Sequence, residues 1–229
     1  MSDLQQQVAE LGLKILGVLE VDEEDRLPAL PGGSVARQLL LIGNAGQEMW
    51  PVFSASAEYA DGEDNPLDRW SQRVAEQLTD KFDVTPLFPF GGPPHWPFVT
   101  WAKRARACHS SPLGMALHPR YGLWHAYRFA LLTSDAEVVS AEVTTDAFAS
   151  AAPCGGCAKP CLSACPVDAF TGQEYLYKTC AEFLAAEPDH PCNHYGCAAR
   201  RACPVGEEYL YPAAQAAFHT EVFVRVNTN

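Results

Sequence analysis

The sequence predicts an α+β domain in residues 1–150, followed by a small cysteine-rich module in residues 151–229 that ends in a helix. In the first part, helical and strand-like patterns alternate without a clean βαβ repeat, which favours a mixed or antiparallel sheet with flanking helices. Eight of the nine cysteines fall between Cys154 and Cys203, so the composition changes sharply near residue 150. The apolar share of 48% is enough for a packed core.

The N-terminal region begins with an amphipathic helix and two strands. Residues 3–11 place Leu4, Val8 and Leu11 on one helical face. Residues 13–21 and 38–42 are short apolar runs rich in branched side chains, which is typical of buried strands. We expect a turn-rich loop between them and a short helix that opens at residues 44–46.

A longer helix is expected to start at Asn65 and Pro66. Asn65 can cap the free amides, Pro66 suits the first helical position, and Asp68 lies near the positive end of the helix dipole. Apolar residues follow at helical spacing: Leu67, Trp70, Val74, Leu78 and Phe82. This pattern predicts an amphipathic helix that packs on the core.

The remaining elements of the first domain are a loop, a helix and a strand pair. Residues 86–97 are rich in proline and paired glycine, so regular structure is not expected there, and the loop either shapes a pocket or simply packs. Residues 98–107 form a helix whose Lys103, Arg104 and Arg106 make a solvated face or contact an anion. Residues 124–133 and 137–143 alternate as two strands, and the boundary between the domains is expected at 149–153.

Charge and hydropathy restrict the function classes. The chain carries 16 Lys and Arg against 28 Asp and Glu, a formal net charge of −12, so we expect no nucleic-acid partner. An acidic surface is compatible with docking to a redox partner protein. No apolar run approaches the roughly 18 residues of a membrane helix, and the N-terminus lacks the pattern of a secretory signal. We therefore expect a cytoplasmic protein whose cysteines serve metal or redox chemistry.

The first cysteine motif reads CGGCAKPCLSACP. It contains Cys154, Cys157, Cys161 and Cys165, spaced by two, three and three residues, with Pro166 after the last. Bacterial [4Fe–4S] ferredoxins have spacings of two, two and three before Cys-Pro, and their fourth cysteine binds the other cluster. Pro160 adds one residue to that pattern, which an outward bulge of the loop can accommodate.

The second motif repeats the first more loosely. Cys180 stands alone, and CNHYGCAARRACP then supplies Cys192, Cys197 and Cys203, again with a proline after the last cysteine. Two sets that each close in Cys-Pro indicate a pseudo-symmetric, two-cluster ferredoxin-like module. One predicted [4Fe–4S] cluster is bound by Cys154, Cys157, Cys161 and Cys203. The other is bound by Cys165, Cys180, Cys192 and Cys197.

Other interpretations of these cysteines stay open. Zinc also binds four thiolates that include Cys-x-x-Cys pairs, disulfides are a further alternative, and the looser second motif leaves the case in which a single cluster forms. Cys108 lies outside both sets beside His109 and is either a packed core residue or a nucleophile or ligand.

The cysteine module resembles that of epoxyqueuosine reductases and corrinoid reductive dehalogenases, which join a cobalamin-binding domain to a two-cluster ferredoxin module. The segment SPLGMALHPRYGLWHAYRFALLTSD is similar to the strand pair that precedes this module in epoxyqueuosine reductases. HPRYGLW, LPGGSVARQLLLIGNAGQEMW and NPLDRW also resemble segments of the cobalamin-processing protein of the methylmalonic aciduria type.

The resemblance implies a flavin-reductase-like fold in residues 1–150 and a cofactor role for His118, Tyr121, Gly122 and Trp124. The cofactor would be cobalamin or a flavin. No aspartate matches the catalytic aspartate of epoxyqueuosine reductase, so tRNA modification is not expected.

Three functional hypotheses follow. The first is an iron–sulfur oxidoreductase of the corrinoid-linked type, in which two [4Fe–4S] clusters pass electrons to a corrinoid, a flavin or another small molecule in the N-terminal domain. The second is an electron-carrier ferredoxin whose N-terminal domain is a non-catalytic docking scaffold. The third is a zinc-stabilised interaction module.

Overall fold

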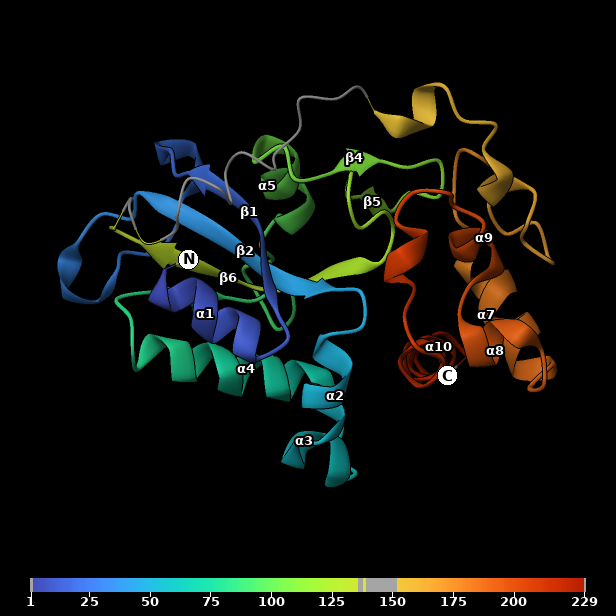
Figure 1. The fold of residues 1–229 in the computed structure, drawn as a ribbon, viewed down its shortest axis with the longest axis horizontal. Coiled ribbons are helices and arrows are strands. Elements are labelled where there is room, and N and C mark those ends of the chain that lie inside the picture. Colours follow the sequence, from blue (N-terminus) through green and yellow to red (C-terminus); the bar gives the residue numbers. More distant parts are fainter. Residues whose placement is uncertain (1, 136–137, 139–151, 229) are drawn as a thin grey trace. The chain divides into compact units, whose positions relative to one another are not determined.

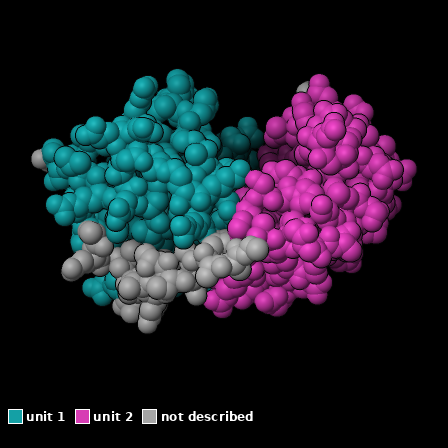
Figure 2. Space-filling model, turned by 90° about the horizontal axis from the view of Figure 1, so that it is seen from above, with its two compact units in different colours: residues 1–108, 125–149 teal, residues 109–124, 150–229 magenta. Residues whose placement is uncertain are grey.

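The computed structural model describes residues 2–135, 138 and 152–228 of the chain. It divides into two compact units, coloured separately in Figure 2. Unit 1 comprises residues 1–108 and 125–149, and unit 2 comprises residues 109–124 and 150–229. Most of the boundary expected at 149–153 lies outside the described residues, as does nearly all of the strand expected at 137–143.

Unit 1 is a mixed α+β unit whose described residues form a four-stranded antiparallel sheet, and the sequence predicts this α+β class. Its elements are α1 (Asp3–Glu10), β1 (Lys14–Glu20), the 3-10 turns η1 (Glu23–Asp25) and η2 (Pro31–Gly33), β2 (Gln38–Ala45), α2 (Met49–Ser54), α3 (Ala57–Ala60), α4 (Pro66–Thr79), β3 (Thr85–Leu87), α5 (Phe98–Arg104) and β6 (His125–Thr133). The strand order is β1-β2-β6-β3. Every neighbouring pair in this sheet is antiparallel.

The core of unit 1 is centred on β2, which pairs with β1 on one side and β6 on the other. Four consecutive residues of β2, Leu39 to Ile42, are fully buried. These four side chains alternate between the two faces of the sheet, so β2, with a neighbouring strand on each side, exposes neither edge nor face. The strand therefore reads as a continuous apolar run in the sequence.

Helices α1 and α4 run along the sheet in Figure 1. Both bury the apolar face that the sequence predicts: Leu4 and Val8 in α1, and Leu67, Trp70, Val74 and Leu78 in α4. Helix α4 ends at Thr79, so Phe82 lies beyond it. The expected cap at Asn65 is wrong in detail, because Asn65 has left-handed backbone angles (φ 53°) and its side chain makes no capping hydrogen bond.

Two further expectations for unit 1 need correction. Residues 44–46 do not open a helix: Asn44 and Ala45 end β2, and α2 starts only at Met49. Pro86 lies inside β3 rather than in a loop. Among the described strands, β3 is at the edge of the sheet, where a residue without an N–H group is tolerated.

Unit 2 is built from turns, several short helices and the 15-residue helix α10. Its elements are β4 (His109–Ser110), β5 (Ala116–Leu117), η3 (Pro153–Gly155), η4 (Pro160–Leu162), α7 (Tyr177–Ala186), α8 (Pro191–Tyr195), α9 (Ala198–Arg201), η5 (Glu207–Tyr209) and α10 (Ala213–Asn227). Leu113, Leu117 and Leu123 pack in one core with Cys161, Cys165 and Cys203. Segment 109–124 therefore packs with the cysteine-rich region although residues 125–149 separate them in the sequence.

None of the helices in the described ranges has the length and apolar character that crossing a lipid bilayer requires.

Candidate iron–sulfur sites

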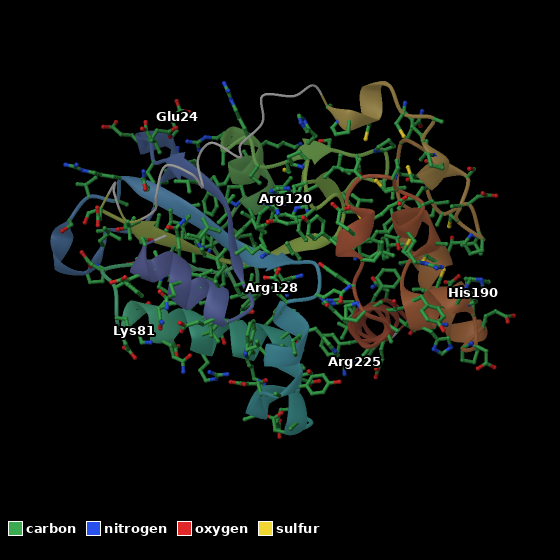
Figure 3. All side chains as sticks on the ribbon, viewed as in Figure 1. Glu24, Lys81, Arg120, Arg128, His190 and Arg225 are labelled. Atoms are coloured by element: carbon green, nitrogen blue, oxygen red, sulfur yellow. The ribbon has the colours of Figure 1, made fainter. Side chains whose placement is uncertain are left out.

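All eight clustered cysteines belong to unit 2, and the sulfur atoms gather in that part of the ribbon in Figure 3. All nine cysteines of the chain are free thiols, which disagrees with the disulfide alternative. The eight divide into two sets, each of which lines its own cavity.

The first set consists of Cys154, Cys157, Cys161 and Cys203, which line one small hollow of about 20 Å³. Cys154 lies in η3 and Cys161 in η4, so two tight turns bring them together. Lys159 takes left-handed angles (φ 56°) between these turns, and its N–H donates to the Cys157 Sγ over 3.3 Å. The residue added to the ferredoxin spacing is thus absorbed in an exposed turn at Lys159 and Pro160.

The second set consists of Cys165, Cys180, Cys192 and Cys197, which line a larger cavity of about 240 Å³. Helix α7 carries Cys180, helix α8 carries Cys192, and Cys197 directly precedes α9. The N–H of Ala169 donates to the Cys165 Sγ over 3.3 Å. Backbone N–H groups at the start of α9 also donate to Cys197.

The electrostatic neighbours of each thiol follow the same grouping. Burial raises the pKa of Cys154, and the next contributions come from Cys203, Cys157 and Cys161. Burial also raises the pKa of Cys180; the Tyr175 hydroxyl opposes this increase, and Cys165 and Cys192 add to it. The first set therefore contains Cys203, the last cysteine of the second motif. The second set contains Cys165, the last cysteine of the first motif.

The arrangement of the four thiols in each set can be compared with the needs of a single metal ion and of a larger metal cluster. Among the residues that the structure describes, no three side chains of His, Cys, Asp or Glu are arranged to hold a single metal ion. A zinc ion needs four ligands at about 2.0–2.3 Å from one centre. Four thiols that line one hollow, with backbone N–H donors to sulfur, are the kind of donor set that binds a [4Fe–4S] cluster.

An arginine braces one wall of the larger cavity. Arg200, in α9, donates from Nε to the carbonyl oxygen of Leu123 over 2.9 Å, and its Nη2 donates to the same oxygen. The guanidinium carbon lies 4.4 Å from the ring centroid of Trp124 and 4.7 Å from that of Tyr211. This contact fixes the end of segment 109–124 against the helix that follows Cys197.

An aromatic stack forms another wall. The Tyr175 ring stacks on Phe170 at 4.6 Å with an interplanar angle of 9°, and on Phe223 of α10 at 6.3 Å and 20°. Burial and the neighbouring Cys180 thiol raise the pKa of Tyr175, so its hydroxyl stays protonated at neutral pH. Neither Tyr175 nor Arg200 is among the site residues predicted from the sequence. The signal for Tyr175 in the sequence is the presence of three aromatic residues, Phe170, Tyr175 and Tyr177, between Cys165 and Cys180.

The four residues expected to hold a cofactor all lie in segment 109–124 of unit 2. His118 Nδ1 accepts from the N–H of Arg120 over 3.1 Å and of Tyr121 over 3.3 Å, which closes a turn. A Cβ on Gly122 would lie 1.8 Å from the carbonyl oxygen of Val205. Trp124 is 1% exposed and lines the larger cysteine cavity.

Tyr121 and Arg120 hold the same turn to the segment after Cys203. The Tyr121 ring packs edge-on against Tyr209 at 4.8 Å, and the Arg120 Nε donates to the Tyr209 hydroxyl over 2.9 Å. Arg120 is labelled in Figure 3. These contacts explain the aromatic and glycine pattern of HPRYGLW through packing within unit 2.

Cys108 and the basic cluster belong to unit 1. Cys108 is buried, and burial raises the pKa of its thiol. Arg104 pairs with Asp22 and Asp25, so it contacts acidic side chains of its own chain. Burial explains Cys108, and the ion pairs with Asp22 and Asp25 explain Arg104.

Comparison with known proteins supports the fold. No protein-family profile and no curated protein matches the chain. Among solved structures, a selenomethionine-labelled epoxyqueuosine reductase matches with a TM-score of 0.51 and 16% identity over 92% of this chain and 66% of that enzyme. A complex of epoxyqueuosine reductase with an epoxyqueuosine-modified tRNA stem loop gives 0.46 and 17% over 94% and 67%. The Streptococcus thermophilus enzyme gives 0.44 and 19% over 92% and 67%. This chain spans about two thirds of the length of these enzymes, and its α+β architecture resembles the fold of epoxyqueuosine reductase.

Proposed function

We propose that the chain is an iron–sulfur redox protein that binds two [4Fe–4S] clusters, one in each cysteine set. The observation that carries the proposal is the division of eight thiols into two cavity-lining sets of four. When bound, the clusters would supply one-electron transfer. The chain contributes thiolate ligands, backbone N–H donors to sulfur and apolar walls that restrict water.

Anaerobic reconstitution tests the number of clusters. The wild-type protein should turn brown and bind two clusters by iron and sulfide analysis. Cys203→Ala should lose about half of the iron, whereas the matched control Cys108→Ala, which lies outside both sets, should keep all of it. A colourless protein that binds zinc in preference to iron would overturn the proposal.

Double variants test the crossed assignment. Cys161→Ala with Cys203→Ala removes two ligands of one proposed cluster, so it should lose no more iron than either single change. Cys161→Ala with Cys165→Ala removes one ligand from each cluster and should lose nearly all of the iron. The opposite result would show that each motif binds its own cluster.

For the electron acceptor, we propose a corrinoid or flavin held by a flavin-reductase-like domain within residues 1–150. The similarity of LPGGSVARQLLLIGNAGQEMW and NPLDRW, which both lie in unit 1, to segments of cobalamin-processing proteins supports this proposal. Titration of the reconstituted protein with cobalamin and with flavin mononucleotide should change the visible spectrum for one of the two. No change with either would favour the electron-carrier alternative, in which a redox partner protein takes the electrons.

The absence of a nucleic-acid partner stays a prediction. It rests on the net charge of −12. A gel-shift assay with a tRNA stem loop tests it directly, and we expect no shift at physiological salt. Saturable binding would contradict the prediction from charge.

A further inference from the structure

We propose that Tyr175 raises the reduction potential of the cluster in the second cysteine set by donating a hydrogen bond to the Cys180 thiolate. The proposal rests on the proposed function, because it requires a cluster bound to Cys165, Cys180, Cys192 and Cys197. It adds a role for a residue that is not itself a ligand.

The backbone around Tyr175 is fixed on the cavity wall. Phe170 and Tyr175 form an antiparallel bridge, and the N–H of Leu176 donates to the carbonyl oxygen of Ala169 over 2.8 Å. Ala169 in turn donates to the Cys165 Sγ. The loop that carries Tyr175 is therefore connected through Ala169 to a cysteine of the same set.

The ring of Tyr175 is held by its stacking contacts with Phe170 and Phe223. Both neighbours line the same cavity as the four thiols. A stacked ring keeps its orientation because rotation would separate the paired faces. The phenol thus presents its hydroxyl in one direction.

Tyr175 and Cys180 line the same cavity. The Cys180 thiol is the nearest electrostatic partner of the Tyr175 hydroxyl, and Cys197 and Cys165 are its further electrostatic neighbours. Three of the four proposed ligands are therefore electrostatic neighbours of one O–H group. In the first set, the donors that the structure describes at Cys157 and Cys161 are backbone N–H groups.

A donor near a cluster favours the reduced state. Reduction adds one negative charge to the cluster and its thiolates, and an O–H group stabilises the more negative form more strongly. Hydrogen bonds to charged groups are strong enough that losing one should lower the reduced-to-oxidised ratio about tenfold at a fixed ambient potential.

The experiment is a potentiometric titration with dithionite as reductant, followed by electron paramagnetic resonance, on the reconstituted full-length chain. Tyr175→Phe keeps the stacked ring and removes only the O–H group. Tyr177→Phe is the matched control, because Tyr177 is an exposed tyrosine that does not line the cavity. We expect one of the two reduction waves to move to lower potential in Tyr175→Phe, and neither to move in Tyr177→Phe.

A second readout separates the hydrogen bond from packing. In resonance Raman spectra of the wild-type protein, transfer to D₂O should shift an iron–thiolate stretch, and Tyr175→Phe should lose part of that shift. If Tyr175→Phe fails to hold the cluster, 3-fluorotyrosine at position 175 replaces it as the test. Its more acidic phenol is a stronger donor, and it should move the same wave to higher potential.

The outcomes distinguish this inference from the proposed function. If the wild type assembles two clusters and neither Tyr175 variant moves a wave, the role of Tyr175 is refuted while the two clusters stand. Equal movement of both waves would indicate a general structural effect and would also refute it. If the wild type binds no cluster, the proposed function fails, and this inference fails with it.

Discussion

Replacing Gly122 by alanine should destabilise unit 2 more than the same change at Gly114. Both glycines have positive φ angles, 56° and 74°, so alanine would be strained at either site by about 1–2 kcal/mol. The two sites differ in the room available for the added Cβ atom. A Cβ at Gly114 meets nothing within 4 Å, whereas a Cβ at Gly122 would lie 1.8 Å from the Val205 oxygen.

The size of the effect follows from that contact. Real Cβ atoms essentially never approach another heavy atom closer than 3.0 Å, so the two segments must separate by about 1.2 Å. Overpacking of this kind costs about 1–3 kcal/mol in addition to the backbone strain. Val205 follows Cys203 by two residues, and the displacement should therefore also weaken the first cysteine set.

Urea unfolding of the metal-free proteins, followed by circular dichroism, measures the difference in unfolding free energy. Iron content after anaerobic reconstitution measures the effect on the cysteine set. We expect Gly122→Ala to be about 1–3 kcal/mol less stable than Gly114→Ala and to bind less iron. Equal stability and equal iron content would refute the close approach of segment 109–124 to Val205.

Three other predictions concern single side chains. Arg200→Lys should lower the unfolding free energy by about 1–3 kcal/mol, because lysine cannot both donate twice to Leu123 and stack on Trp124; Arg201→Lys is the control, and equal effects would contradict this. Arg73 holds the pKa of Glu58 below its ordinary value, so this pair stabilises the fold above about pH 4.3 and the stabilisation is lost as pH falls through the folded pKa. Glu58→Gln should therefore cost about 0.5–1 kcal/mol at pH 7 and flatten the acid limb of the stability curve. Burial raises the pKa of Cys108, because the buried site favours the neutral thiol over the thiolate. The contribution of this thiol to the stability of the fold is therefore complete below about pH 8.5 and is lost as pH rises through the pKa of Cys108 in the folded protein. Iodoacetamide at pH 7.5 should label Cys108 only after unfolding, and rapid labelling of the native protein would contradict its burial.

The sequence predicts those features that depend on local pattern. Helix α4 and strand β2 are found where apolar periodicity places them, because each packs one continuous face or run against the core. Pro86 shows the limit of local rules, since its place in a strand is allowed only by an edge position that pairing with β6 creates.

The cysteine sets and segment 109–124 show the same contrast. Spacing alone suggests the crossed sets, because Cys-Pro endings carry a known ligation pattern. The position of segment 109–124 is not encoded locally. It depends on the contact between Gly122 and Val205 and on the bond from Arg200 to Leu123, which join positions more than 70 residues apart.

The interleaving of the two units has a consequence for biosynthesis. A chain emerging from the ribosome releases segment 109–124 before β6, although β6 completes the sheet of unit 1 by pairing with both β2 and β3. Unit 1 therefore cannot finish folding until segment 109–124 of unit 2 has been synthesised. This segment meets the rest of unit 2 only after about 30 or more further residues have been synthesised. A fragment that starts at residue 150 would lack Leu113, Leu117 and Leu123 from its core and should not assemble clusters when expressed alone.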